Sequence, residues 1–323
     1  KLFIMLSRRF LRVKVLQEVY ACHQAQDTDL VKAEKRLLEN VDNLYELFVY
    51  QLSFWVELKR FAERRIEENR EKNFPTYEDL HPNLKFVSNR VLDMLENNDH
   101  LIALEEHYKI NWSEYREDFI RSCYNKLREL PEYVEYMNSS VSSFEDDKKL
   151  IVDIVDKYFA EDDFLYDFYA DRKLSFNSDY QLGVFLLWKF FCEMDNGFNE
   201  KTKLPPAYKT EFSAVNDDKI YVTKLFRKMM ENADDYKAIV EKHVANWNYD
   251  RLALMDRILI FMAMTEYEVF HDIPVKVTIN EYIELSKYFS TPDSRRFING
   301  MLDKIAQVMK EEGKLVKTGR GLI

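Results

Sequence analysis

The stretch from Trp247 to Ile305 reads WNYDRLALMDRILIFMAMTEYEVFHDIPVKVTINEYIELSKYFSTPDSRRFINGMLDKI. Within it, Thr291-Pro292-Asp293-Ser294 has the form of a helix start. Threonine can cap a helix, proline fits its first position, and aspartate complements the positive end of the helix dipole. The stretch therefore predicts three successive helices, over about 250–269, 276–288 and 292–310.

The rest of the chain is equally poor in turn-forming residues. Its 323 residues include only 6 Gly and 7 Pro, whereas doubly wound folds and β-sandwiches need frequent glycine-bearing turns and strand-like alternation. Apolar residues often recur at helical spacing, so an all-α fold is predicted. Further helices are expected at about 7–26 (with Ser7 as N-cap), 31–72, 84–97, 100–109, 113–129, 145–159, 161–172, 179–194, 217–231 and 233–246.

Charge is distributed unevenly along the chain. The net charge of −10 by itself disfavours nucleic acid as a partner, because phosphate binding needs a basic surface. However, residues 1–26 carry a net +4, residues 27–215 carry −14, and residues 216–323 are neutral. The acidity thus lies in the middle of the chain. The segment Gly197–Pro206, with the polar run that follows it to Asp218, is the clearest linker in the chain.

No motif typical of catalysis or of a metal centre occurs in the sequence. The six histidines have no ligand spacing, and there is neither a phosphate-binding glycine loop nor a nucleophile elbow. Cys22, Cys123 and Cys192 form no pair and are expected to be free buried thiols in a reducing cytosol. No apolar run reaches membrane length. We therefore expect a cytoplasmic protein that is not an enzyme, needs no cofactor and does not act at a membrane.

Two blocks of sequence resemble the NusB family of transcription antitermination factors. The first is SRRFLRVKVLQEVYACHQ, an Arg-rich opening followed by Gln17 and Tyr20. The second block carries the family's signature pieces in order, which are Asp256-Arg257, Ile273-Pro274, Ile279-Asn280-Glu281, Asp293-Ser294, Phe297, Asn299-Gly300 and Leu302-Asp303. The resemblance covers about 130 residues and fails across about 28–215. It implies a NusB-like helical bundle of residues 1–27 and 216–323, with an acidic helical insertion at 28–215.

The resemblance also implies a function. NusB proteins bind the boxA element of nascent ribosomal RNA together with NusE, a small-subunit ribosomal protein, in the transcription elongation complex. A boxA-like RNA and a NusE protein are therefore the expected partners. One departure from the family concerns Phe261, which stands where NusB proteins usually carry an arginine inside the helix, so a polar role at this position is not carried over.

The candidate RNA-binding residues lie in the two blocks. Arginines can neutralise phosphates, an aspartate can accept from an exocyclic amine, and an aromatic ring can stack on an unpaired base. The predicted set is Arg8, Arg9, Arg12, Tyr20, Lys287, Asp293, Ser294, Arg295, Arg296 and Phe297, with Lys314 and Lys317 as weaker candidates.

Each of these residues also has a structural interpretation. The arginines can form a solvated helix face, and Phe297 and Tyr20 can belong to the core. Gly300 is interpreted as a packing position, and Asn280 and Glu281 as a brace for a neighbouring helix. The alternative function is a helical scaffold for protein contacts that has lost RNA binding. The insertion, in turn, is interpreted as a partner surface or as a cover for a self-association surface.

Overall fold

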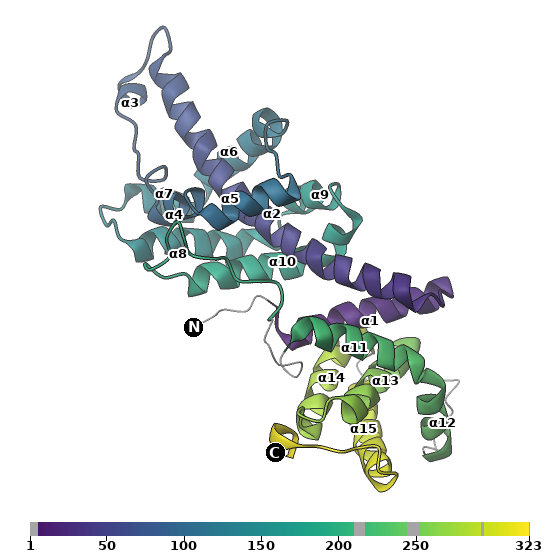
Figure 1. Cartoon of the computed structure of the whole chain (residues 1–323). Coiled ribbons are helices and arrows are strands. Elements are labelled where there is room, and N and C mark those ends of the chain that lie inside the picture. Colours follow the sequence, from purple (N-terminus) through teal and green to yellow (C-terminus); the bar gives the residue numbers. More distant parts are fainter. Residues whose placement is uncertain (1–5, 210–216, 244–251, 292–293, 323) are drawn as a thin grey trace. The chain divides into compact units, whose positions relative to one another are not determined.

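The computed structural model of the chain describes residues 6–209, 217–243, 252–291 and 294–322. Helices make up 75% of the structure and no described residue lies in a strand, which confirms the all-α prediction. The chain forms two compact units, which are residues 1–41 with 206–323 and residues 42–205 (Figure 1). The division predicted from the resemblance has different boundaries and stays a prediction.

Helix α13 is the centre of the first unit. It spans Leu254–Val269, and every residue from Ile258 to Tyr267 is buried. A helix that is buried all round must be enclosed by other elements. The enclosing helices are α1 (Arg8–Ala25), α11 (Asp218–Glu231), α14 (Val275–Phe289) and α15 (Ser294–Glu311), with α12 (Ala233–His243) beside them.

The chain after α15 returns to the carboxyl end of α13. The backbone amide of Thr318 donates to the carbonyl of His271 at 2.9 Å. Gly321, in the short 3-10 helix η4 (Gly319–Leu322), approaches so closely that an added Cβ would lie 2.0 Å from the same His271 carbonyl oxygen. Only glycine fits this contact, so the tail is held against α13 at a defined place.

The second unit is built around the later part of α2, a single helix from Leu30 to Arg70. Its other elements are α3 (Tyr77–Leu80), α4 (Arg90–Glu96), α5 (Asp99–Tyr108), the π-helix η1 (Arg116–Ile120), α6 (Arg121–Glu129), α7 (Pro131–Asn138), α8 (Phe144–Ile154), the π-helix η2 (Val155–Phe159), α9 (Asp163–Ala170) and α10 (Leu174–Glu193).

Aromatic side chains fill the interior of this second unit. Trp55 of α2 is fully buried and stacks on Phe159, with 5.5 Å between ring centroids and 5° between ring planes. Helices α2 and α10 approach closely at Gly183, where an added Cβ would lie 2.8 Å from Cδ2 of Leu47. The buried residues Leu44, Phe48, Leu52, Trp55 and Leu58 of α2 are thus part of the core of the second unit.

Most of the predicted helices are present within one to three residues of the expected ends. The helices expected to begin at about 84 and 179 begin instead at Arg90 and Leu174. Three further expectations are wrong in detail. Ser7 precedes α1 but its side chain makes no cap hydrogen bond; its carbonyl accepts from Phe10 and Leu11 instead. Gly300 is exposed, and an added Cβ would meet nothing within 4 Å, so it does not serve close packing. Cys192 is exposed, whereas Cys22 and Cys123 are buried as expected.

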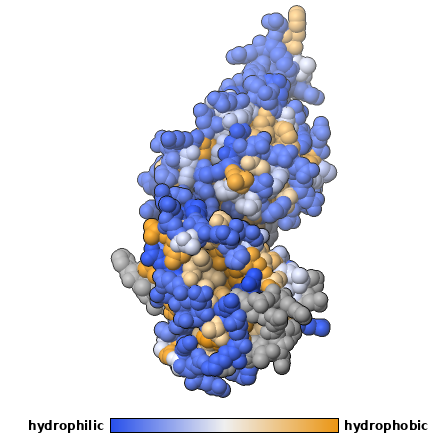
Figure 2. Space-filling model, turned by 90° about the vertical axis from the view of Figure 1, so that its right-hand side faces the viewer, coloured by the Kyte–Doolittle hydropathy of each residue, from blue (hydrophilic) through white to orange (hydrophobic). Residues whose placement is uncertain are grey.

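The face of the molecule shown in Figure 2 is mostly hydrophilic, with some apolar patches. The largest exposed apolar side chains include Phe74, which is 93% exposed in the segment between α2 and α3. Among the helices that the structure describes, none has the length and apolar character needed to cross a bilayer.

Candidate nucleic-acid interface

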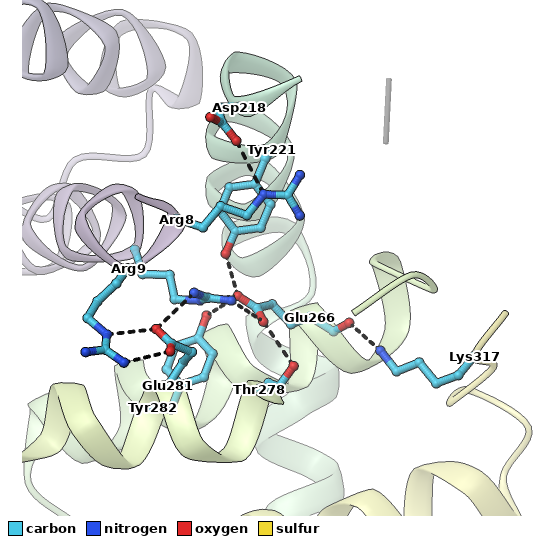
Figure 3. Close-up of polar contacts among 10 residues, drawn as sticks. Arg8, Arg9, Asp218, Tyr221, Glu266, Thr278, Glu281, Tyr282 and Lys317 are labelled. Carbon is cyan, nitrogen blue, oxygen red and sulfur yellow. Dashed lines mark hydrogen bonds and ion pairs between the residues drawn. The ribbon is translucent and has the colours of Figure 1, made fainter. Parts of the chain in front are cut away.

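The amino-terminal arginines meet carboxylates from other helices of the first unit. Arg12 of α1 is only 3% exposed. Its Nε donates to Oε1 of Glu266 at 2.6 Å and its Nη2 to Oε2 at 3.0 Å, while Nη1 donates to Glu281 at 3.3 Å (Figure 3). A two-pronged contact of this kind uses the full planar geometry of the guanidinium. The structure therefore places Arg12 inside the fold, between α1, α13 and α14.

Glu266 is the acceptor at the centre of this arrangement. It is fully buried, and it also accepts hydrogen bonds from Tyr221 Oη at 2.5 Å, Thr278 Oγ1 at 3.0 Å and Tyr282 Oη at 3.1 Å. Burial would raise the pKa of Glu266, but the charge and hydrogen bonds of Arg12 outweigh it, and the pKa lies below its ordinary value. The buried pair is therefore charged and fully hydrogen-bonded.

Arg8 and Arg9 are also paired, at the edge of the same network. Nε of Arg8 lies 3.3 Å from Oδ1 of Asp218, and its guanidinium lies over the ring of Tyr221. Arg9 donates to both oxygens of Glu281, at 3.0 and 2.7 Å, and its side chain is 46% exposed (Figure 3). Glu281 thus joins Arg9 to Arg12 and braces α14 against α1, in line with its predicted structural role.

The start of α15 has a buried side and an exposed side. Ser294 is 5% exposed, and its hydroxyl donates to Oδ2 of Asp256 at 2.8 Å. Ser290 donates to the other oxygen of Asp256 at 2.5 Å, and its hydroxyl oxygen lies 2.9 Å from that of Ser294. The hydroxyl of Ser294 thus ties α15 to α13, so it is a positioning group and not an exposed one.

The exposed side of α15 carries two cations of the predicted set. Arg295 and Arg296 are exposed and Phe297 is partly buried. The pKa of the partly exposed Glu284 is lowered, first by a hydrogen bond from Lys287 and then by the charges of Lys287, Arg9 and Arg295. Arg9 of α1, Lys287 of α14 and Arg295 of α15 therefore lie near the carboxylate of Glu284.

The remaining predicted residues are less closely grouped. Tyr20 is 38% exposed on α1. It lies eight residues beyond Arg12, which is about 12 Å along a helix. Lys317 is partly buried, and its Nζ donates to the carbonyls of Glu266 and Phe270, each at 3.0 Å. Asp293 lies outside the described residues. The sequence did not identify the carboxylates Glu266, Glu281 and Asp218 as partners, although Glu281 stood in the quoted I-N-E motif.

Comparison with known proteins finds a similarity to the NusB family in the carboxyl-terminal part of the chain. The profile of the NusB family matches residues 189–307. The transcription antitermination protein NusB of Salinibacter ruber is 43% identical over 103 residues, which are 32% of this chain and 64% of that protein. The NusB protein of Koribacter versatilis is 29% identical over 130 residues, which are 40% of this chain and 89% of that protein.

Residues 189–307 of the chain thus match the NusB family profile, and the first unit, which contains residues 206–323, is called the NusB domain below. The chain is longer than the NusB proteins that it matches. The NusB protein of Chloroherpeton thalassium is 38% identical over 105 residues. The chain covers only 64% of the length of the Salinibacter ruber protein and 50% of that of the Chloroherpeton thalassium protein. No solved structure matches the chain. Most of the second unit thus lies outside the NusB profile, which begins at residue 189.

The NusB domain shows how the departure at Phe261 is accommodated. This side chain is 6% exposed on α13, and its ring lies 6.0 Å from that of Tyr236, at 63° between the ring planes. A phenylalanine at this place strengthens the packing of α12 on α13. The side chain at this position is therefore apolar and belongs to the packing between α12 and α13.

Proposed function

We propose that this protein binds a boxA-like single-stranded RNA and acts, with a NusE ribosomal protein, as a transcription antitermination and ribosomal RNA biogenesis factor. It would do so in the transcription elongation complex. The observation that carries the proposal is the match of the NusB profile to residues 189–307, which include the exposed Arg295 and Arg296 beside Phe297.

The charges of the NusB domain support different roles for its cationic side chains, some holding the fold and others contacting RNA. Arg8 and Arg12 are engaged with carboxylates, and Arg12 is buried, so these two hold α1 in place. Arg295 and Arg296 contact the phosphates, because they are exposed near the positive end of the α15 dipole. Arg9 and Lys287 flank them and bind RNA by exchanging a carboxylate for a phosphate.

Phe297 supplies the base contact in this proposal. Its side chain is partly exposed one residue after the two arginines, where an unpaired base can stack on the ring. Stacking on an aromatic side chain contributes about 1–3 kcal/mol per base. Tyr20 lies on α1, and Asp293 precedes the two arginines in sequence. Ser294 also precedes them, and it acts by fixing the start of α15 through its hydrogen bond to Asp256.

The test is an RNA-binding titration over a salt series, with and without the NusE protein. The probe is a short boxA-like RNA, compared with the same RNA in scrambled order. Each phosphate contact contributes about 0.7 to the slope of log K against log salt for a single strand. The double variant Arg295→Ala/Arg296→Ala should therefore bind more weakly and lower the slope by roughly 1.4. Phe297→Leu should reduce the preference for the boxA-like order.

A matched control is available on the same helix. Lys304 and Lys310 are exposed on α15, more than two turns beyond the arginines. The double variant Lys304→Ala/Lys310→Ala removes the same charge and should leave affinity and slope nearly unchanged. Equal losses in the two double variants would show that only the net charge matters, and the proposed site would be refuted.

A second function is favoured by the pairing of the amino-terminal arginines. Because Arg8, Arg9 and Arg12 all contact carboxylates, the NusB domain can equally serve as a helical scaffold that has lost RNA binding. The same titration separates the two functions. No binding of either RNA, even with the NusE protein present, would establish the scaffold and refute the RNA-binding proposal.

A further inference from the structure

The ring of Tyr288 lies in solvent in the last turn of α14. It is 79% exposed, whereas Tyr20, the next most exposed aromatic side chain that the structure describes in the first unit, is 38% exposed. Among the described residues, none makes a hydrogen bond or a ring contact with Tyr288. Single exposed apolar side chains are common on protein surfaces, so the surroundings of this ring decide whether it has a role.

Tyr288 ends a stripe of side chains on the outer face of α14. Residues three and four positions apart lie on the same face of a helix, and Glu281, Glu284 and Tyr288 follow that spacing. The two carboxylates are partly exposed, while Tyr282 and Leu285 of the same helix are buried. The stripe therefore faces outward, with the aromatic ring at its carboxyl end.

Cations from three helices lie along this stripe. Arg9 of α1 donates to Oε1 of Glu281 at 2.7 Å (Figure 3). Lys287 of α14, the neighbour of Tyr288 in sequence, donates to Oε1 of Glu284 at 2.5 Å. Arg295 of α15 is exposed, and its charge acts on Glu284 together with that of Arg9. The ring is thus part of a surface where α1, α14 and α15 bring their charged side chains together.

The charges of this surface nearly cancel, which limits what it can bind. Three cations face two carboxylates, so a phosphate gains a cation here only by displacing a carboxylate. The carboxyl end of α14 is also the negative end of its dipole, which disfavours a phosphate at Tyr288 itself. An unpaired base carries no charge and meets neither obstacle. Proteins that bind single strands combine cations along the backbone with aromatic rings under the bases.

We propose that Tyr288 stacks on an unpaired base of the bound RNA. This inference rests on the proposed RNA-binding function and adds a second ring to the site, in addition to Phe297. Arg9, Lys287 and Arg295 contact the phosphates on either side of the stacked base. The RNA site thereby extends from the start of α15 onto the last turn of α14.

The first test measures affinity over a salt series, with the full-length protein and a short boxA-like single-stranded RNA. Loss of one stacked base lowers affinity roughly 5- to 150-fold, so Tyr288→Ala should bind more weakly than the wild-type protein by a factor in that range. The slope of log K against log salt should stay unchanged, because tyrosine carries no charge. Tyr288→Phe, which keeps the ring, should bind like the wild-type protein, and Tyr288→Leu should not.

A matched control is available in the second unit. Tyr77 of α3 is 78% exposed, so Tyr77→Ala removes an equally accessible ring. This variant should leave RNA affinity unchanged.

A second measurement locates the stacked base. RNAs with a single abasic site, placed at each position in turn, are titrated with the wild-type protein and with Tyr288→Ala. At the stacked position the abasic site should weaken binding to the wild-type protein but cause no further loss in Tyr288→Ala, because both changes remove the same contact. At the other positions the two losses should multiply.

The outcomes separate this inference from the RNA-binding function on which it rests. Full affinity in Tyr288→Ala, or losses that multiply at every abasic position, would overturn the inference and leave the RNA-binding function intact. A loss in Tyr288→Ala that occurs only when the NusE protein is present would assign the ring to a protein interface and would overturn it as well. Absence of RNA binding by the wild-type protein would refute the RNA-binding function, and the inference with it.

Discussion

The buried pair of Arg12 and Glu266 allows the sharpest test of the fold. The variant Arg12→Met keeps most of the side-chain volume but leaves the Glu266 carboxylate, which is fully buried, without its counter-charge. The three hydroxyl groups that also contact Glu266 do not replace a charge. Breaking a buried ion pair by removing one partner typically costs 3–5 kcal/mol. We expect a loss of about that size in the first unit.

Hydrogen exchange measured by mass spectrometry is the suitable assay, because two compact units need not unfold together. Each 1.4 kcal/mol changes an opening constant tenfold, so amides of α13 and α14 should exchange roughly 10²–10⁴ times faster in Arg12→Met. Peptides from residues 42–205 are the internal control and should be unchanged. The double variant Arg12→Met/Glu266→Gln should recover much of the protection, since it leaves no isolated charge. Exchange in α13 within a factor of three of the wild-type rate would refute the argument.

Two further predictions concern other buried polar groups. Burial lowers the pKa of Lys317 to about 8 despite the opposing charges of Glu266 and Asp272, so between pH 8 and 10 the unfolded chain holds a proton that the folded protein has lost. The contribution of this lysine to stability should therefore rise with pH across that window. The difference in urea midpoint between the wild-type protein and Lys317→Met should therefore be larger at pH 9.5 than at pH 7.5. An unchanged or smaller difference at pH 9.5 would contradict this sign. Gln51 is fully buried with neither amide atom hydrogen-bonded among the described residues, so Gln51→Met should stabilise the second unit by about 1–3 kcal/mol, as judged from slower exchange in the middle of α2. Faster exchange there would show that the amide has a partner.

The helices could be predicted because each depends on local pattern. The spacing of Leu37, Val41, Leu44 and Phe48 is sufficient to indicate α2, and rarity of glycine excludes most other folds. The helix α7 was not predicted, since its eight residues bury only Tyr133 and Tyr136 and give too short a period to recognise. The π-turn of η2 was also missed, because its pattern differs from that of an α-helix by a single residue.

The candidate site was predicted less completely than the fold. The sequence placed Arg9 and Arg12 on one side of α1, and the structure does bring both to Glu281. The sequence could not show that Arg12 is buried, because its main partner, Glu266, is 254 positions away. Whether a charged side chain faces solvent or a distant carboxylate depends on tertiary packing, which the spacing within one helix does not determine.

The two compact units also differ in when their parts leave the ribosome. Residues 42–205 are continuous in sequence, so the second unit can fold as soon as they have been synthesised. The first unit needs α13 as its centre, and α1 must wait for residues 206–323 before its apolar face is covered. At typical synthesis rates of about 5–20 residues per second, the roughly 300 residues that follow α1 take about 15–60 s. The NusB domain is therefore completed only after residues 42–205 have been synthesised. A chaperone that shields α1 would act during that interval.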